Sequence, residues 1–183
     1  MYNKIVIGID QSYTRTGICI SADGEVKKAS SLNFKGKKSK TEKRNEVRKQ
    51  LKKIIEANID KCKEMVVMVE RMRSYSSNNQ ENSGKVKYKK DTERLISSIV
   101  DVAYEYGIKT FSVDTRAWKS QVVGTTESLE NKFKVDPKKW PTILFVEEKL
   151  GISVHSRNKL GNIKYNDDMA DSICISLYGF IPG

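Results

Sequence analysis

The stretch that decides the fold is residues 1–20, MYNKIVIGIDQSYTRTGICI. Residues 5–9 are apolar and mostly β-branched, which is typical of a buried strand, and they lead directly into a carboxylate, Asp10. A polar turn follows, and residues 17–20 form a second apolar run. The stretch therefore predicts two neighbouring strands, with an acidic side chain at the end of the first.

The rest of the chain alternates strand and helix patterns. Asp23-Gly24 predicts a hairpin into a third strand at residues 26–32, because glycine tolerates the positive φ that such turns need. Ser39 and Glu42 have the spacing of a capping box and mark the start of the first helix. Further strands are predicted over residues 65–69 and 109–113, further helices over 95–103, 141–150 and 167–177, and polar loops over 71–90 and 152–163.

This order of elements predicts an α/β fold. We expect a mixed five-stranded sheet flanked by helices, in which the first three strands are antiparallel and the later two are parallel additions made through helical crossovers. A length of 183 residues suits one domain with a core, and no linker or internal repeat divides the chain. We therefore expect a single domain over residues 1–183.

The chain is strongly basic, with a formal net charge of +11. Residues 35–53 hold ten Lys or Arg and two Glu, and Lys85, Lys87, Lys89 and Lys90 form a second basic cluster. Either cluster alone is equally well explained by a solvated helix face or loop. The two clusters together favour an acidic polymer as partner, with nucleic acid first and an anionic membrane surface second.

Several classes of protein are disfavoured by what the sequence lacks. No apolar run approaches the ~20 residues that span a bilayer, and the N-terminus has no signal-peptide pattern, so we expect a soluble cytoplasmic protein. Three scattered cysteines without a CxxC pair indicate reduced thiols. His155 is the only histidine, which argues against a catalytic triad and a multi-histidine zinc site.

Four carboxylates stand out by position. Asp10 and Glu70 each follow an apolar strand, and Asp168 and Asp171 lie three residues apart on one face of the last helix. Taken singly, each has an ordinary explanation as a turn residue, a strand end or a helix N-terminal acid. Taken together, they predict an oxygen-rich site for Mg²⁺ or Mn²⁺, of the kind that hydrolyses phosphodiesters with two metal ions. The sequence leaves open whether Asp167 or Asp168 is the first ligand of the last helix.

Three motifs, IGIDQSYTRTG, VMVERM and DDMADS, resemble the RuvC family of Holliday junction resolvases, which have the RNase H-like fold. The resemblance implies that Asp10, Glu70, Asp168 and Asp171 are catalytic residues that bind two Mg²⁺ ions, for which Mn²⁺ can substitute. Residues 118–124 look like the family's K-x-x-V-V-G segment, which implies that Lys119 supports DNA binding and cleavage. The implied activity is paired nicking of four-way DNA junctions by a homodimer, leaving 5′-phosphate and 3′-hydroxyl ends, with no nucleotide cofactor.

The sequence departs from the family's pattern after Glu70. The family commonly has an aromatic residue three positions further on, where this chain has Arg73, with Tyr75 two positions later. We expect Arg73 and Tyr75, together with Lys85 and Lys87, to contact the DNA. These departures suggest a divergent or phage-encoded member of the family, acting in a bacterial cytoplasm or in a phage-infected host.

Other functions fit parts of the sequence. A broader branched-DNA or flap nuclease, or an RNase H-like enzyme that acts on hybrids, would use the same acids. An actin-like or sugar-kinase-like ATPase also places a strand, an Asp and a Thr-containing turn in this order, but no second phosphate loop is found. A DNA-binding module without catalysis would be expected to lose at least one of the acids, and all four are present.

Overall fold

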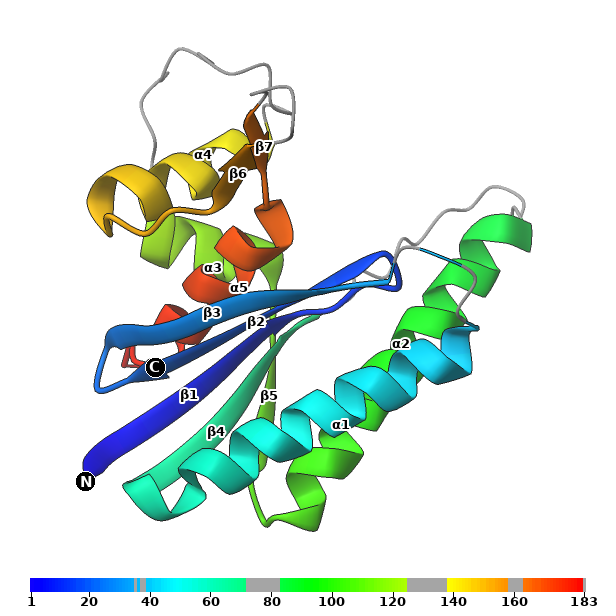
Figure 1. Ribbon diagram of the computed structural model, residues 1–183, viewed down its shortest axis with the longest axis horizontal. Helices are drawn as coiled ribbons and strands as arrows, with labels where there is room; N and C mark the ends of the chain where they lie inside the picture. The colour runs from blue at the N-terminus through cyan, green and yellow to red at the C-terminus, as the bar shows by residue number, and fades with distance from the viewer. Residues whose placement is uncertain (35, 37–38, 72–82, 125–137, 158–162, 183) are drawn as a thin grey trace.

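A computed structural model describes residues 1–34, 36, 39–71, 83–124, 138–157 and 163–182, with residues 83–89 described by backbone alone. Its main sheet has the strand order β3-β2-β1-β4-β5 (Figure 1). β1, β2 and β3 are antiparallel neighbours, and β4 and β5 are added in parallel, so the predicted mixed five-stranded sheet is confirmed. The strands are β1 Tyr2–Asp10, β2 Arg15–Ala22, β3 Glu25–Asn33, β4 Cys62–Glu70 and β5 Lys109–Val113.

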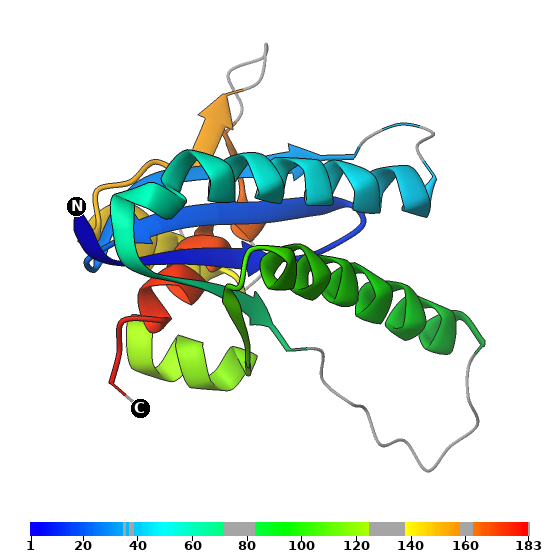
Figure 2. The same cartoon turned by 90° about the horizontal axis from the view of Figure 1, so that it is seen from below.

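Helices cover both faces of this sheet. α1 and α2 lie on one face, and α3, α4 and α5 lie on the other (Figures 1 and 2). No helix within the described ranges is long and apolar enough to cross a membrane. The helical segments are α1 Lys40–Asn58, η1 Ile59–Lys61, α2 Ser83–Glu105, α3 Thr115–Trp118, η2 Lys119–Val123, α4 Trp140–Leu144, η3 Phe145–Lys149 and α5 Asp167–Tyr178, where η1 is a 3₁₀ turn and η2 and η3 are π-helical.

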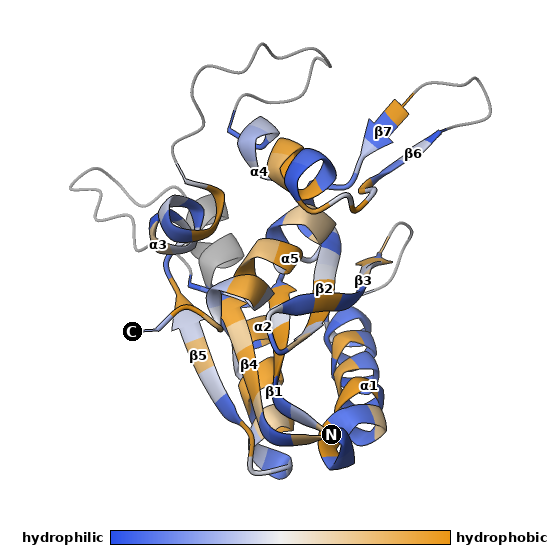
Figure 3. Ribbon diagram, turned by 90° about the vertical axis from the view of Figure 1, so that its left-hand side faces the viewer, coloured by the Kyte–Doolittle hydropathy of each residue, from blue (hydrophilic) through white to orange (hydrophobic). Residues whose placement is uncertain are grey.

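The alternation of side chains along β1 divides the core into two layers. Ile5, Ile7 and Ile9 pack with α1 and α2, whereas Val6 packs with the layer that contains α5. β4 follows the same rule, and Figure 3 shows hydrophobic residues concentrated on β1, β4 and α5. Because both faces of these central strands are covered, their sequences are continuous apolar runs rather than alternating patterns.

Two glycines allow α5 to approach the sheet closely. A Cβ atom on Gly8 of β1 would collide with the carbonyl oxygen of Ser172 and the backbone nitrogen of Ser176. A Cβ atom on Gly17 of β2 would collide with the backbone carbonyl of Asp168. The backbone of α5 therefore rests directly on β1 and β2, at a distance that only glycine permits at these two positions.

The helix ends mostly agree with the sequence-based expectations. The capping box is confirmed, since the Ser39 hydroxyl accepts from the Glu42 N–H at 3.2 Å and the Glu42 carboxylate accepts from the Ser39 N–H at 2.6 Å. Asn166 caps α5, and Gly107 follows α2 with a φ of 68°.

The predictions of two loops were partly wrong. The segment 71–90 was expected to be a loop, but α2 already begins at Ser83, because lysine-rich sequence extends a helix readily once its later turns are packed. The expected loop 152–163 instead contains the start of a small hairpin, formed by β6 His155–Arg157 and β7 Ile163–Tyr165. Strands of three residues are too short to show a period in sequence. The helical turns of α3 and η2 were not predicted at all.

We expect Gly8→Ala to lower the free energy of unfolding by about 1–3 kcal/mol, because the added methyl group must push α5 away from β1. Urea denaturation monitored by circular dichroism measures the change in the free energy of unfolding. Ser112→Ala on the exposed edge strand is the control and should change stability by less than ~0.5 kcal/mol. Equal midpoints for the two variants would contradict the close approach of α5.

Candidate active site

The first two predicted acids lie side by side at the ends of neighbouring strands. Asp10 is the last residue of β1 and Glu70 is the last residue of β4. The two strands are parallel and Ile9 pairs with Val69, so Asp10 and Glu70 occupy the next equivalent positions. Both side chains therefore leave the sheet on the face that α5 covers.

The last helix brings the other two acids to the same place. The residue that pairs with Asp10 on β2 is Gly17, which lies directly beneath the carbonyl group of Asp168. Asp171 follows one turn later on the same face of α5. The first turn of α5 thus lies over the end of β1, where the predicted carboxylates gather.

The pKa values of these carboxylates are shifted by burial and by one another's charges. Burial raises the pKa of Asp10 well above its ordinary value, and the charges of Asp171, Glu70 and Asp168 raise it further. Burial raises the pKa of Asp171 to about 7, with the Lys119 ammonium opposing this shift and the Glu70 charge adding to it. The site therefore concentrates negative charge that the protein alone does not fully neutralise.

Two cations that sequence reasoning missed bind the start of α5. Arg15 forms ion pairs with both Asp167 and Asp168, and Lys139 forms one with Asp167. Partial burial raises the pKa of Asp167, but Lys139 and Arg15 outweigh it and leave this pKa below its ordinary value. Burial raises the pKa of Asp168 and prevails over the opposing hydrogen bond from Arg15. The only sequence signal for Arg15 is its place in the turn after Asp10.

Glu70 is held by two further residues that the sequence did not single out. The Thr115 hydroxyl, in the first turn of α3, donates to a Glu70 carboxylate oxygen at 2.6 Å. The Gln11 side-chain amide donates to the Glu70 carbonyl oxygen at 2.7 Å. Gln11 is only 7% exposed, and its Oε1 atom is buried without a hydrogen-bond partner among the described residues.

Lys119 also lies beside the acids. It begins η2, its ammonium group lies 5.1 Å from the centroid of the Trp118 ring, and it donates to the carbonyl oxygen of Lys138 at 3.3 Å. Its charge lowers the pKa of Asp171, which places the ammonium group within electrostatic reach of that carboxylate. Of the predicted DNA-binding residues, Lys119 is the one whose side chain lies within the described part of the chain.

The side chains of the other predicted DNA-binding residues are either not described by the structure or already form ion pairs within the protein. Arg73 and Tyr75 lie outside the described residues, and Lys85 and Lys87 lie on α2 where only the backbone is described. In the basic segment 35–53, several cations pair with α2 rather than facing solvent unpaired. These pairs are Lys40 with Asp91, Arg48 with Asp101 and Glu105, and Lys52 with Glu105.

The donor set fits a hard divalent cation. The candidate ligands are carboxylate oxygens, which Mg²⁺ and Mn²⁺ prefer. A divalent cation would stabilise the ionised forms of Asp10 and Asp171, whose pKa values are raised by burial and by neighbouring carboxylates. Within the described ranges, no three His, Cys, Asp or Glu side chains converge closely enough to hold a metal ion as they stand. The residues that would hold the cation are Asp10, Glu70, Asp168 and Asp171.

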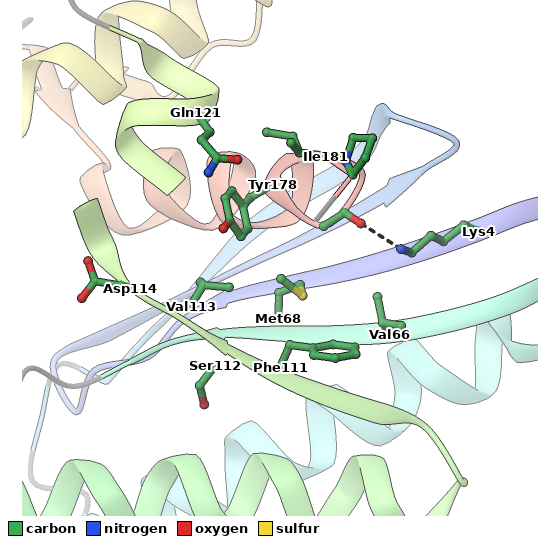
Figure 4. A pocket seen from close by; sticks show the side chains of 12 residues that line it. Lys4, Val66, Met68, Phe111, Ser112, Val113, Asp114, Gln121, Tyr178 and Ile181 are labelled. Atoms are coloured by element: carbon green, nitrogen blue, oxygen red, sulfur yellow. Dashed lines mark hydrogen bonds between the residues drawn. The ribbon is translucent and has the colours of Figure 1, made fainter. Parts of the chain in front are cut away.

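A pocket lies on the same face of the sheet, between β5 and the C-terminal end of α5 (Figure 4). It is bordered by Phe111 and Met68 below and by Tyr178 above, and Lys4 closes one side by donating to the carbonyl oxygen of Gly179 at 2.9 Å. None of the candidate ligands lines it, so we assign it no part in the chemistry of the carboxylates.

The strand order and the helices on both faces of the sheet agree with the RNase H-like fold that the sequence predicted, and comparison with known proteins supports this fold. No protein-family model matches the sequence, and no curated protein sequence matches it. Solved structures do match: RuvC from Thermus thermophilus bound to a Holliday junction substrate has a TM-score of 0.64 at 14% identity, covering 96% of this chain and 92% of that one.

Two further matches agree with this result. A second structure of Thermus thermophilus RuvC has a TM-score of 0.61 at 15% identity, covering 95% of this chain and 92% of that one. The yeast mitochondrial Holliday junction resolvase Ydc2 has a TM-score of 0.54 at 18% identity, covering 97% of this chain and 78% of that one. This chain therefore has the fold of RuvC and Ydc2 along nearly its whole length.

The raised pKa of Asp171 predicts how stability depends on pH when no divalent cation is present. Asp171 keeps its proton up to about pH 7 in the folded protein but loses it near 3.8 when unfolded. The folded state thus binds more protons between these values, so its stability falls as the pH rises from about 4 to 7. Asp171→Asn removes this loss and should raise the melting temperature in EDTA more at pH 8 than at pH 5. An equal rise at both pH values would contradict the shifted pKa.

Proposed function

We propose that this chain is a metal-dependent endonuclease that resolves four-way DNA junctions. The observation that carries the proposal is the gathering of Asp10, Glu70, Asp168 and Asp171 from β1, β4 and α5, within the fold of RuvC and Ydc2. The RuvC structure is a complex with a Holliday junction substrate, and Ydc2 is a Holliday junction resolvase. The sequence motifs at the same four positions point independently to the same activity.

The residues of the site suit phosphodiester hydrolysis. Two bound Mg²⁺ ions would supply an activated water and stabilise the leaving oxygen, which gives 5′-phosphate and 3′-hydroxyl products. Asp10 and Asp171 provide partly buried carboxylates whose raised pKa values would be offset by a nearby positive charge. Thr115 fixes one oxygen of Glu70, and Lys119 contributes a positive charge near Asp171 that suits a phosphate of the bound DNA strand.

The net charge of +11 supports binding to the DNA backbone. Lys40, Arg48 and Lys52 form ion pairs with α2. We therefore expect the other Lys and Arg residues of segment 35–53 to contact the phosphates. We propose Arg73, Tyr75, Lys85 and Lys87 as further DNA contacts, with Tyr75 stacking where the junction opens. Contacts to phosphates would position the DNA without reading its sequence.

We further propose that the active species is a homodimer, because a four-way junction presents two equivalent strands for paired cleavage. β5 forms an open edge of the sheet, and exposed apolar side chains lie on it and on the preceding helix. On α2, Val100 is 39% exposed and Tyr104 is 83% exposed, and on β5, Phe111 is 48% exposed. A second copy of the chain is the partner that would cover these side chains.

Asp10→Asn should abolish cleavage of a synthetic four-way junction in Mg²⁺ while leaving junction binding intact, because it removes a ligand without disturbing the basic surface. Denaturing gels measure cleavage and mobility shifts measure binding. Asp60→Asn, an exposed acid in η1, is the control and should cut normally. Full cleavage by Asp10→Asn would sink the assignment.

The wild-type protein should place paired, symmetrical nicks in the junction and should cut flaps, forks and RNA–DNA hybrids much more slowly. End-labelling of each strand shows where the nicks fall. Equal rates on flaps and forks would instead indicate a broader branched-DNA nuclease, and preference for hybrids would indicate an RNase H-like enzyme.

Tyr104→Asp should convert the dimer into a monomer at micromolar concentration, because a charge would be buried at the centre of the proposed contact. Analytical ultracentrifugation measures the mass. Ile163→Asp, an equally drastic change at a 41% exposed residue of β7, is the control and should leave the dimer intact. A wild-type protein that stays monomeric would contradict the proposed assembly.

A further inference from the structure

Arg15 joins two adjacent carboxylates at the start of α5. Its Nη2 atom pairs with Oδ1 of Asp167, and its Nε atom pairs with Oδ2 of Asp168. The three side chains are only 21%, 15% and 17% exposed, so this is a partly buried pairing rather than a loose surface contact. The planar guanidinium group presents its N–H donors in a fixed fork, which sets the orientation of both acids.

Asp167 and Asp168 differ in how many of their carboxylate oxygens already pair with a cation. Both oxygens of Asp167 are taken by cations, because Lys139 pairs with Oδ2 while Arg15 holds Oδ1. Asp168 is held through Oδ2 alone, and within the described part of the chain its Oδ1 atom has no hydrogen bond or ion pair. Asp168 also shares its helix face with Asp171, one turn later. Of the two acids, therefore, only Asp168 has a carboxylate oxygen without a cation partner in the described part of the chain.

The backbone that carries Arg15 is itself fixed. The Ser12 hydroxyl accepts from the Arg15 N–H at 3.0 Å and donates to the Arg15 carbonyl oxygen at 2.8 Å. The Thr16 hydroxyl donates to the Ser12 carbonyl oxygen at 2.9 Å, which closes the turn between β1 and β2. Arg15 thus follows a hydrogen-bonded turn that begins immediately after Asp10. The turn fixes the position of the Arg15 backbone relative to the end of β1, where Asp10 lies.

We propose that Arg15 is a positioning residue that gives the two acids different roles. Together with Lys139 it neutralises Asp167, and it holds Asp168 by one carboxylate oxygen so that the other oxygen can bind the divalent cation. This inference rests on the proposed function and deepens it, because it assigns Asp168 rather than Asp167 as the ligand. Partners that orient a ligating carboxylate typically change metal affinity about 10–100-fold when they are removed.

The competing explanation is a structural one, in which Arg15 only fastens β2 to α5. The direction of the effect on cation binding separates the two. Removing Arg15 takes a positive charge away from the site, which by itself would strengthen the binding of a divalent cation. A loss of affinity in Arg15→Ala is therefore opposite to the effect of the lost charge and indicates lost orientation of Asp168, whereas a purely structural role would lower the melting temperature without weakening cation binding in the folded protein.

The test is isothermal titration of Mn²⁺ into the full-length protein without DNA. We expect Asp168→Asn and Arg15→Ala each to weaken Mn²⁺ binding about 10-fold or more, and Asp167→Asn to weaken it less than about threefold. Arg15→Lys keeps the charge but loses the fork, so its affinity should fall between those of the wild type and Arg15→Ala. Arg48→Ala is the matched control, because it also removes an arginine that pairs with two carboxylates, on the opposite face of the sheet.

Each result has a defined meaning. Unchanged or tighter Mn²⁺ binding in Arg15→Ala, or a larger loss for Asp167→Asn than for Asp168→Asn, would overturn the inference while leaving the proposed function in place. Circular dichroism checks that each variant is folded, and if Arg15→Ala does not fold, Arg15→Lys and the two Asn variants decide the same question. A wild-type protein that binds no Mn²⁺ at all would instead count against the proposed function itself.

Discussion

The constraint on which the rest of the structure depends is the direct contact between the backbone of α5 and the strands beneath it. Gly8 and Gly17 provide it, because any side chain at either position would meet the α5 backbone. That contact brings Asp168 and Asp171 over the end of β1, close enough for their charges to raise the pKa of Asp10. The tight packing that stabilises the core therefore also creates the charge repulsion of the site.

This repulsion is balanced only in part by the protein. Asp167 and Asp168 have guanidinium or ammonium partners, whereas Asp10 and Asp171 are partly buried acids with no ion pair among the described residues, and their pKa values rise. A buried carboxylate that lacks a strong partner costs stability, and folds keep such groups where a ligand compensates them. Asp167 has a cation on each carboxylate oxygen, whereas Asp10, Asp171 and the second oxygen of Asp168 lack such a partner among the described residues, which is the reason to expect cation binding there and not at Asp167.

Local patterns were enough to predict the sheet and the acids. Asp10 and Glu70 each follow an unbroken apolar run, and the spacing of Asp168 and Asp171 fixes their common face, so these features are written into consecutive residues. Arg15, Lys139, Thr115 and Gln11 were missed because their partners lie between 28 and 153 residues away along the chain. Such pairings form only in the folded chain, and no periodic pattern in the sequence predicts them.

The basic segment 35–53 shows how charge and site are connected. Counting charges predicted a surface for a polyanion, but Lys40 pairs with the nearly buried Asp91, and the Asp91 carbonyl oxygen accepts the Tyr13 hydroxyl at 2.9 Å. Lys43 in turn donates to the Tyr13 carbonyl oxygen at 2.9 Å. Tyr13 belongs to the turn that carries Arg15, so α1 and α2 hold this turn from the face opposite α5. Part of the basic charge of this segment therefore holds the turn between β1 and β2 in place.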